Sequence, residues 1–193
     1  MSRLSFILAS ASPRRAELLR QIGLEFEVAP GQTPEVHDEQ LTAWEMAQIN
    51  AYRKARFVAK RFPDALVLGA DTLVYLDRET KLFGKPANRE DAFRMLSELQ
   101  GRTHAVITGV CLLHLREHRQ SVFAEWTDVT FLPLSGEQIN NYLALVDPLD
   151  KAGAYAIQEH GEKIISEISG SYSNVVGLPL ELLQREMQAW ATK

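Results

Sequence analysis

Hydrophobic and polar residues follow two patterns that recur along the whole chain. Short apolar runs, such as 6–9 and 66–68, are typical of buried strands. Longer stretches carry apolar residues three or four positions apart, which predicts amphipathic helices at 13–22, 41–61 and 178–190. Because strands and helices are mixed rather than segregated, the pattern predicts an α/β fold with a mixed, twisted central sheet flanked by helices.

Capping residues indicate where several of the predicted helices begin. Ser12 is a suitable N-cap with Pro13 at the first helical position, and Asn88 opens a further helix over 88–99. The run 135–138, Ser-Gly-Glu-Gln, is a capping box that predicts a helix to about residue 146. The helix over 41–61 is expected to place these residues on one apolar face: Trp44, Ala47, Ala51, Ala55 and Val58.

Further strands are predicted from apolar runs bounded by turn residues. A second strand is expected at 26–29, an antiparallel pair at 103–115 and 121–132, and another strand near 164–168. Residues 66–68 and 73–76 are predicted to be two separate strand segments, with 69–72 forming the turn between them.

Composition narrows the class of protein. The 193 residues are 46% hydrophobic, enough for one domain or one domain with two lobes around a cleft. The formal net charge of -4 disfavours nucleic acid as the main partner, although a local basic pocket remains compatible with it. The single cysteine, Cys111, excludes an internal disulfide framework and lies in an apolar run. No signal peptide or membrane span is apparent, so we expect a cytoplasmic protein without a membrane partner.

The segment from the first strand to the first helix has the layout of an anion site. Ser10 and Ser12 precede a helix whose first backbone N–H groups lack intrahelical acceptors, and Arg14 and Arg15 add permanently charged donors. The alternative is an ordinary capped helix with solvated arginines.

Three other charged residues stand out. Asp71 lies in an apolar stretch, where a carboxylate needs a partner such as a divalent metal or a water to be activated; the alternative is an Asx-turn. Lys85 occupies the rigid turn Gly84-Lys85-Pro86 and Lys54 lies in the middle of a helix. Each lysine alone would be interpreted as solvated.

The segment 147–158 combines polar residues with small ones that permit close approach of a ligand. Gln158 at its end has the donor and acceptor pair needed to recognise a base edge, or is simply a surface amide. The chain lacks the sequence motifs of zinc peptidases, α/β-hydrolases, P-loop enzymes and Rossmann dehydrogenases.

Together these residues resemble the Maf family of nucleoside triphosphate pyrophosphatases. The shared motifs, in order, are LASASPRR (8–15), KA (54–55), LGADT (68–72), GKP (84–86), TGV (108–110), DKAGAYAIQ (150–158) and GSYSNVVGLPL (170–180). The resemblance implies one domain over 1–193, with two lobes around a nucleotide-binding cleft. It also implies attack of water on the α-phosphorus, with release of pyrophosphate and a nucleoside monophosphate.

Three positions are similar to the branch of the family that acts on dTTP and UTP, with modified pyrimidine nucleotides as a further substrate class. A sister branch acting on 7-methyl-GTP has tryptophan, SDQ and glutamate where this chain has Arg14, Ala70-Asp71-Thr72 and Gln158. Two positions depart from the family pattern: the acidic loop reads Thr33-Pro34-Glu35, and Ala156 replaces a common glycine.

The resemblance assigns roles to the candidate residues. Asp71 is expected to be the general base or the partner of a metal-bound water, with Glu35 as a second ligand to Mg²⁺ or Mn²⁺. Phosphate contacts are expected from Arg14, Lys54 and Lys85, assisted by Ser10 and Arg15, because positioning and electrostatics dominate phosphoryl transfer.

Two functions of other classes stay open at this point. A nucleotide-binding regulator of cell division or septum formation needs the phosphate contacts but not Asp71, and a generic surface-binding domain needs neither. In the enzyme interpretation the partner is a small nucleoside triphosphate; a homodimer is compatible with the sequence.

Overall fold

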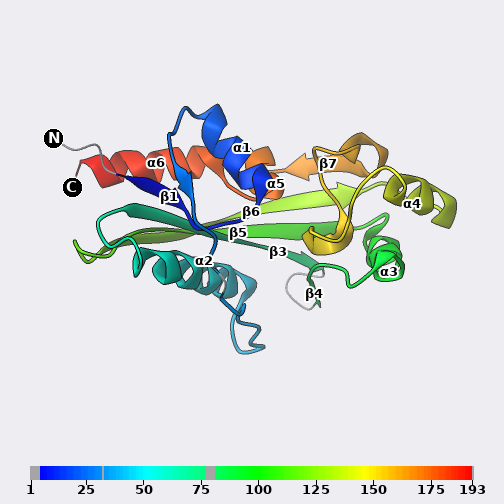
Figure 1. Cartoon of the computed structure of the whole chain (residues 1–193). Helices are drawn as coiled ribbons and strands as arrows, with labels where there is room; N and C mark the ends of the chain where they lie inside the picture. Colours follow the sequence, from blue (N-terminus) through cyan, green and yellow to red (C-terminus); the bar gives the residue numbers. More distant parts are fainter. Residues whose placement is uncertain (1–4, 32, 77–80, 193) are drawn as a thin grey trace. The chain divides into compact units, whose positions relative to one another are not determined.

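The computed structural model describes residues 5–31, 33–76 and 81–192 (Figure 1). Within them, seven strands form one sheet in the order β2 (Glu27–Val28), β1 (Phe6–Leu8), β3 (Leu66–Leu76), β5 (Thr103–His114), β6 (Arg119–Phe131), β7 (Ile165–Ser169), with β4 (Lys81–Phe83) paired to β3. Strand β1 is parallel to β2 and to β3, whereas β3–β4 and β6–β7 are antiparallel. The predicted mixed α/β fold is therefore confirmed.

The capping residues predicted correctly where three helices begin, namely α1, α3 and α4. The helices of the described residues are α1 (Pro13–Gln21), α2 (Ala43–Ala59), α3 (Arg89–Leu99), α4 (Gly136–Leu143), α5 (Tyr172–Val176) and α6 (Leu180–Ala191), with single 3₁₀ turns η1 (Ala152–Ala154) and η2 (Gly161–Lys163). Ser12 caps α1, Asn88 caps α3 and the capping box at Ser135 opens α4. None of the described helices has both the length and the hydropathy that crossing a membrane requires.

The chain forms two compact units, which we call the first and the second unit. The first unit holds the chain up to Asp71, Thr108–Glu125 and the part from Gly177 onward; the second holds Thr72–Ile107 and Trp126–Val176. The predicted nucleotide cleft, and the expectation that 1–193 acts as one domain, stay predictions.

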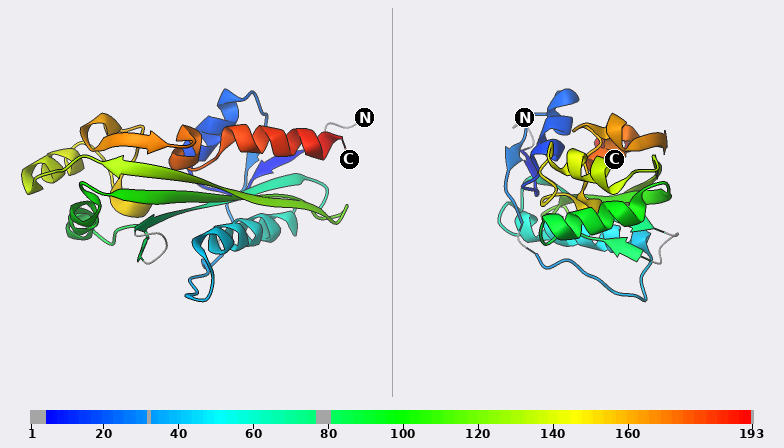
Figure 2. Two further views of the ribbon diagram at one scale, coloured as in Figure 1. Left: turned by 180° about the vertical axis from the view of Figure 1, so that it is seen from behind. Right: turned by 90° about the vertical axis from the view of Figure 1, so that its right-hand side faces the viewer.

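In the first unit, α2 covers one face of the strands, and α1 and α6 lie on the opposite side (Figures 1 and 2). Helix α2 approaches the sheet closely because glycines face it: a Cβ on Gly69 of β3 would collide with the Ala51 carbonyl oxygen, and one on Gly109 of β5 would collide with Ala47. Small side chains on both surfaces thus allow backbone-to-backbone packing.

This close packing explains one wrong prediction. Trp44 was expected on the buried face of α2, yet it is 39% exposed. The contact with the sheet is made by alanines, among them Ala47, Ala51 and Ala55, and an indole cannot fit between backbones that approach so closely.

A second expectation is corrected at β3. Residues 69–72 were predicted to form a turn, but β3 runs without interruption from Leu66 to Leu76, and Asp71 and Thr72 lie within it. Gly69 is not a turn residue, because its lack of a side chain permits the close contact with α2. The elements β4 and α5 were not predicted.

The core of the second unit is built from α3, α4 and the strand segments of that unit. His104, Phe131 and Tyr155 stack edge to face in it, with ring centroids 4.8 to 5.4 Å apart. Burial lowers the pKa of His104 to about 3, so its imidazole is neutral at pH 7.

Candidate active site

Asp71 lies at the centre of a charged cluster in the first unit. It is 3% exposed, and its Oδ1 accepts from Lys54 Nζ at 2.5 Å while its Oδ2 accepts from Asn50 Nδ2 at 3.0 Å. Asn50 and Lys54 are four residues apart on α2 and therefore project from the same face of the helix. The close approach of α2 at Gly69 brings both side chains down to β3.

The loop that carries Glu35 is tied to the same two residues. Lys54 Nζ lies 2.9 Å from Glu35 Oε1. The Asn50 amide bonds to the backbone of Val36, with its Oδ1 accepting from Val36 N at 2.7 Å and its Nδ2 lying 3.4 Å from Val36 O. The ammonium of Lys54 therefore joins the two carboxylates that the sequence assigned to one metal site.

Asn50 is a site residue that the sequence analysis missed. It is 1% exposed, and its side chain bonds to Val36 and to Asp71. The available signal was an amide on the apolar face of an amphipathic helix, because a buried polar side chain needs a hydrogen-bonding partner.

Arg15 binds three segments of the first unit. Its Nη1 donates to Ser10 Oγ at 3.1 Å and to Ala70 O at 3.0 Å, and its Nε donates to Gly177 O at 2.8 Å. Burial lowers the pKa of Arg15 and the charge of Arg14 acts in the same direction, while Asp71 and Glu35 oppose them. Arg15 thus links the residues after β1, the residue before Asp71 and Gly177, where the C-terminal part of the first unit begins.

Ser10 and Arg14 complete the predicted anion site. Ser10 is buried and its Oγ accepts from Ser12 N at 3.2 Å. Arg14 lies half-buried in the first turn of α1. The structure therefore brings Ser10, Arg14, Arg15, Lys54, Asp71 and Glu35 into one unit, and their contacts with substrate stay predictions.

Lys85 and Gln158 lie in the second unit, where both are exposed. Their loops meet, because Gly153 N donates to Gly84 O at 3.1 Å. Thr72 follows Asp71 in β3 and is half-buried. That Lys85, Gln158 and Thr72 contact the same nucleotide as the first-unit residues stays a prediction.

Comparison with known proteins decides the family. A family model described as Maf-like protein matches residues 5–190. The chain belongs to the Maf family.

It is 51% identical to a dTTP/UTP pyrophosphatase from Symbiobacterium thermophilum, over 90% of this chain and 88% of that protein. Proteins of the same name from Gloeobacter violaceus (49% identical, 92% and 91% covered) and Carboxydothermus hydrogenoformans (44% identical, 95% and 97% covered) are similar throughout. Among solved structures, a HAM1 protein from Coxiella burnetii is 19% identical with a TM-score of 0.47, over 67% of this chain and 73% of that one.

Residues 170–176 of the motif 170–180 in this Maf family member have a structural explanation within the second unit. Asn174 is buried and its Nδ2 donates to Val106 O at 3.0 Å and to Thr127 Oγ1 at 2.9 Å. Ser171 N donates to the same Thr127 hydroxyl at 3.1 Å. Gly170, at φ +131°, has no room for a Cβ beside Thr127. These contacts fix α5 to β5 and β6.

The carboxylates of the first unit fit a hard divalent cation. Asp71 and Glu35 both reach Lys54 Nζ, so their oxygens are no farther apart than the sum of those two distances. Over 5–31, 33–76 and 81–192, no group of three or more His, Cys, Asp or Glu is arranged to hold a metal. Two carboxylates nevertheless suffice for Mg²⁺, which is commonly bound by one or two carboxylates together with substrate phosphates and waters.

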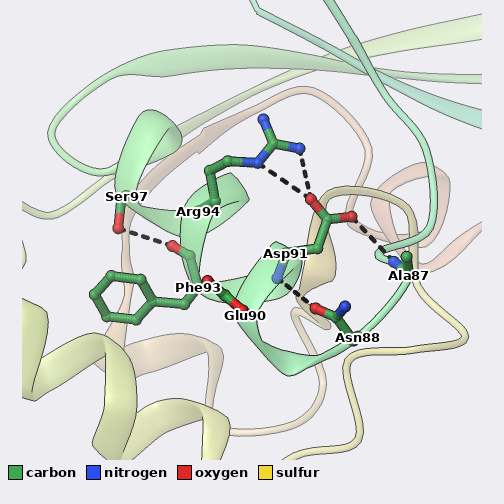
Figure 3. Close-up of a pocket in the computed structure, with 7 residues that line it drawn as sticks. All are labelled: Ala87, Asn88, Glu90, Asp91, Phe93, Arg94 and Ser97. Carbon is green, nitrogen blue, oxygen red and sulfur yellow. Dashed lines mark hydrogen bonds and ion pairs between the residues drawn. The ribbon is translucent and has the colours of Figure 1, made fainter.

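A hollow of about 720 Å³ on α3 in the second unit contains none of the candidate residues (Figure 3). It is lined by Ala87, Asn88, Glu90, Asp91, Phe93, Arg94 and Ser97. Its side chains bond to one another and to their own helix: Asp91 accepts from Ala87 N at 3.0 Å and from Arg94, and Ser97 donates to Phe93 O at 2.7 Å. We assign no functional role to this hollow.

Proposed function

We propose that this Maf family member hydrolyses dTTP and UTP to the nucleoside monophosphate and pyrophosphate. The observation that carries the proposal is the buried carboxylate of Asp71, held between Lys54 and Asn50 in a unit that also contains Ser10, Arg14 and Arg15. The names of the similar proteins support pyrimidine nucleotides as the substrate.

In this mechanism Asp71 accepts the proton of a water that attacks the α-phosphorus. Lys54 and Asn50 each occupy one carboxylate oxygen, and an ionised carboxylate offers about four lone-pair sites, so acceptor positions remain for the water. The new bond forms between the water oxygen and phosphorus, the bond to the bridging oxygen breaks, and pyrophosphate leaves. A carboxylate held at both oxygens keeps its orientation through the step.

Basic side chains and a divalent cation are proposed to neutralise the negative charge of the triphosphate. Arg14 is proposed to bind phosphate oxygens as a bidentate donor, and Lys85 as a point charge from the turn before α3. A divalent cation, Mg²⁺ or Mn²⁺, held by Asp71 and Glu35 would neutralise phosphate charge when bound.

Base selection is proposed to come from Gln158 and Thr72 of the second unit and from Arg14 of the first unit. Gln158 presents an amide donor and acceptor pair, which suits the edge of a pyrimidine, with Thr72 and Arg14 as further specificity residues. The sequence positions that distinguish the two branches of the family support this choice.

The proposal implies a small-molecule partner and a cytoplasmic setting. The net charge of -4 supports the absence of nucleic acid as a partner. A homodimer stays a prediction that sedimentation at micromolar concentration would test.

A hydrolysis assay with a matched carboxylate control tests the function. Purified protein is incubated with dTTP, UTP and 7-methyl-GTP in Mg²⁺ or Mn²⁺, and products are separated by chromatography. We expect dTMP or UMP with pyrophosphate, and a fall in turnover of about 100-fold or more for Asp71→Asn. Asp64→Asn, at an exposed carboxylate paired with Arg116, should retain wild-type turnover.

Two results would refute the proposal. Release of a nucleoside diphosphate with single phosphate would exclude attack at the α-phosphorus. Unchanged turnover in Asp71→Asn would exclude Asp71 as the general base and with it the proposed mechanism.

A further inference from the structure

The segment 147–160 of the second unit, yellow in Figure 1, has a backbone that few sequences adopt unaided. Gly153, Ala154 and His160 all have positive φ values, of 72°, 65° and 58°. A left-handed conformation is unfavourable for alanine and histidine, so contacts elsewhere must hold the segment in this shape.

Three contacts hold the middle of the segment. Tyr142 of α4 bonds to both backbone groups of Ala156, with its hydroxyl accepting from Ala156 N at 3.1 Å and lying 3.4 Å from Ala156 O. The Tyr155 hydroxyl lies 2.8 Å from His104 Nε2. Gly153 N donates to Gly84 O. These contacts act on 153–156 and leave the entry and exit of the segment to be held by other groups.

Lys151 bridges the entry and the exit. Its Nζ lies 2.7 Å from Asp147 O and 2.7 Å from Asp150 Oδ1 on the entry side, and 3.5 Å from Glu159 Oε1 on the exit side. Its side chain is 6% exposed. A lysine is rarely buried to this extent unless its charge is paired, so the ammonium and its three partners hold one another in place.

We propose that Lys151 is a positioning residue for base recognition: its buried ammonium closes the segment 147–159 and thereby fixes Gln158 next to Glu159. The proposal rests on the proposed function, because it assigns a cause to the geometry of the residue that selects the base. Lys151 does not contact the nucleotide in this scheme. It acts through Glu159, the neighbour of Gln158, and through the two acceptors at the entry.

The central test combines hydrogen exchange with steady-state kinetics on Lys151→Met, which keeps the length of the side chain but removes its charge. Without nucleotide, the amides of 149–152 and 157–160, at the entry and the exit of the segment, should exchange about tenfold faster or more, because the segment loses its bridge. With Mg²⁺, KM for dTTP should rise about tenfold or more while kcat stays within about threefold. The preference for dTTP over dATP should fall by a similar factor, about tenfold.

Two variants serve as controls. Lys163→Met removes an exposed lysine from η2 and should change neither exchange nor selectivity. Asp150→Asn removes one carboxylate partner at an exposed position and should shift both readouts in the same direction by a smaller factor. It decides the question if Lys151→Met does not fold.

Unchanged exchange in the variants would overturn the proposal. Faster exchange with unchanged KM and unchanged base preference would also overturn it, since the lysine would then only stabilise the fold. If the wild-type protein does not hydrolyse pyrimidine triphosphates, the proposed function and the role in recognition fail together. The exchange data still decide whether Lys151 orders the segment.

Discussion

The two partners of the Lys54–Asp71 ion pair should differ in what their removal costs the fold. Lys54 contacts a second carboxylate, Glu35, at 2.9 Å, whereas the Asp71 carboxylate accepts from Lys54 and Asn50. We therefore predict that Lys54→Met is more destabilising than Asp71→Asn.

The expected magnitudes follow from what each variant leaves behind. Lys54→Met leaves a buried carboxylate with the neutral amide of Asn50, and breaking a buried pair in this way costs about 3–5 kcal/mol. The positive charge of Arg15, which interacts with Asp71, places the expected loss near the lower end, at about 3 kcal/mol. Asp71→Asn leaves Lys54 paired with Glu35, so only one charged hydrogen bond is weakened, at about 1.5 kcal/mol.

Urea denaturation at pH 7 in EDTA measures the two losses without a contribution from bound metal. The variants should share the wild-type m-value, so that the difference in midpoint reports the free energy of unfolding. Lys60→Met, at an exposed lysine at the end of α2, is the matched control and should lie within about 0.5 kcal/mol of wild type. Equal losses, or a larger loss for Asp71→Asn, would refute the reasoning, because Glu35 would then give Lys54 no support.

Three further predictions concern packing, capping and pH. Gly69→Ala should lose about 2 kcal/mol or more in urea denaturation, because its Cβ meets the Ala51 carbonyl oxygen, while Gly84→Ala has open space and should not. Ser135→Ala removes the capping box of α4 and should lower stability by about 1 kcal/mol in the same assay, with no effect on dTTP turnover. His104 is neutral when folded because burial lowers its pKa from 6.5 to about 3, so its contribution is fully present above pH 6.5 and declines as the pH falls towards 3. Between pH 7 and pH 5 the loss should be about 2 kcal/mol, and it should be absent in His104→Asn; an equal pH slope in both proteins would contradict the assignment.

The parts of the fold that depend on local chemistry could be predicted from the sequence. The N-caps of α1, α3 and α4 lie at Ser12, Asn88 and Ser135 because a capping side chain bonds to backbone N–H groups only two or three residues away. The strands β5 and β6 were likewise predicted as an antiparallel pair, with β5 visible as a partly continuous apolar run.

The errors arose where a residue serves a distant contact. Gly69 has the composition of a turn, but the reason for a glycine there is the backbone of α2, which is far away in the sequence. The exposure of Trp44 has the same origin. Periodicity shows which face of a helix is apolar, and it does not show how near the opposing surface lies.

In the candidate site, too, the sequence predicted the types of residue but not their geometry. The sequence identified Asp71, Lys54 and Glu35 as chemically important, yet it treated the lysine as a phosphate ligand and the acids as metal ligands. That one ammonium joins both carboxylates depends on the approach of α2 to β3, which no local pattern encodes.

The two roles of Lys54 are compatible because its two partners differ in exposure. The side chain of Glu35 is 42% exposed and that of Asp71 is 5% exposed. Water can replace the lysine at Glu35 at little cost, since exposed ion pairs contribute about 0–1 kcal/mol. Separating Lys54 from Asp71 would leave a charge buried without its partner, which costs several kcal/mol, on the order of 3–5.

A triphosphate that binds Lys54 is therefore expected to displace Glu35 and not Asp71. Glu35 would then lose its contact with the lysine, while the proposed base keeps the contacts that orient it.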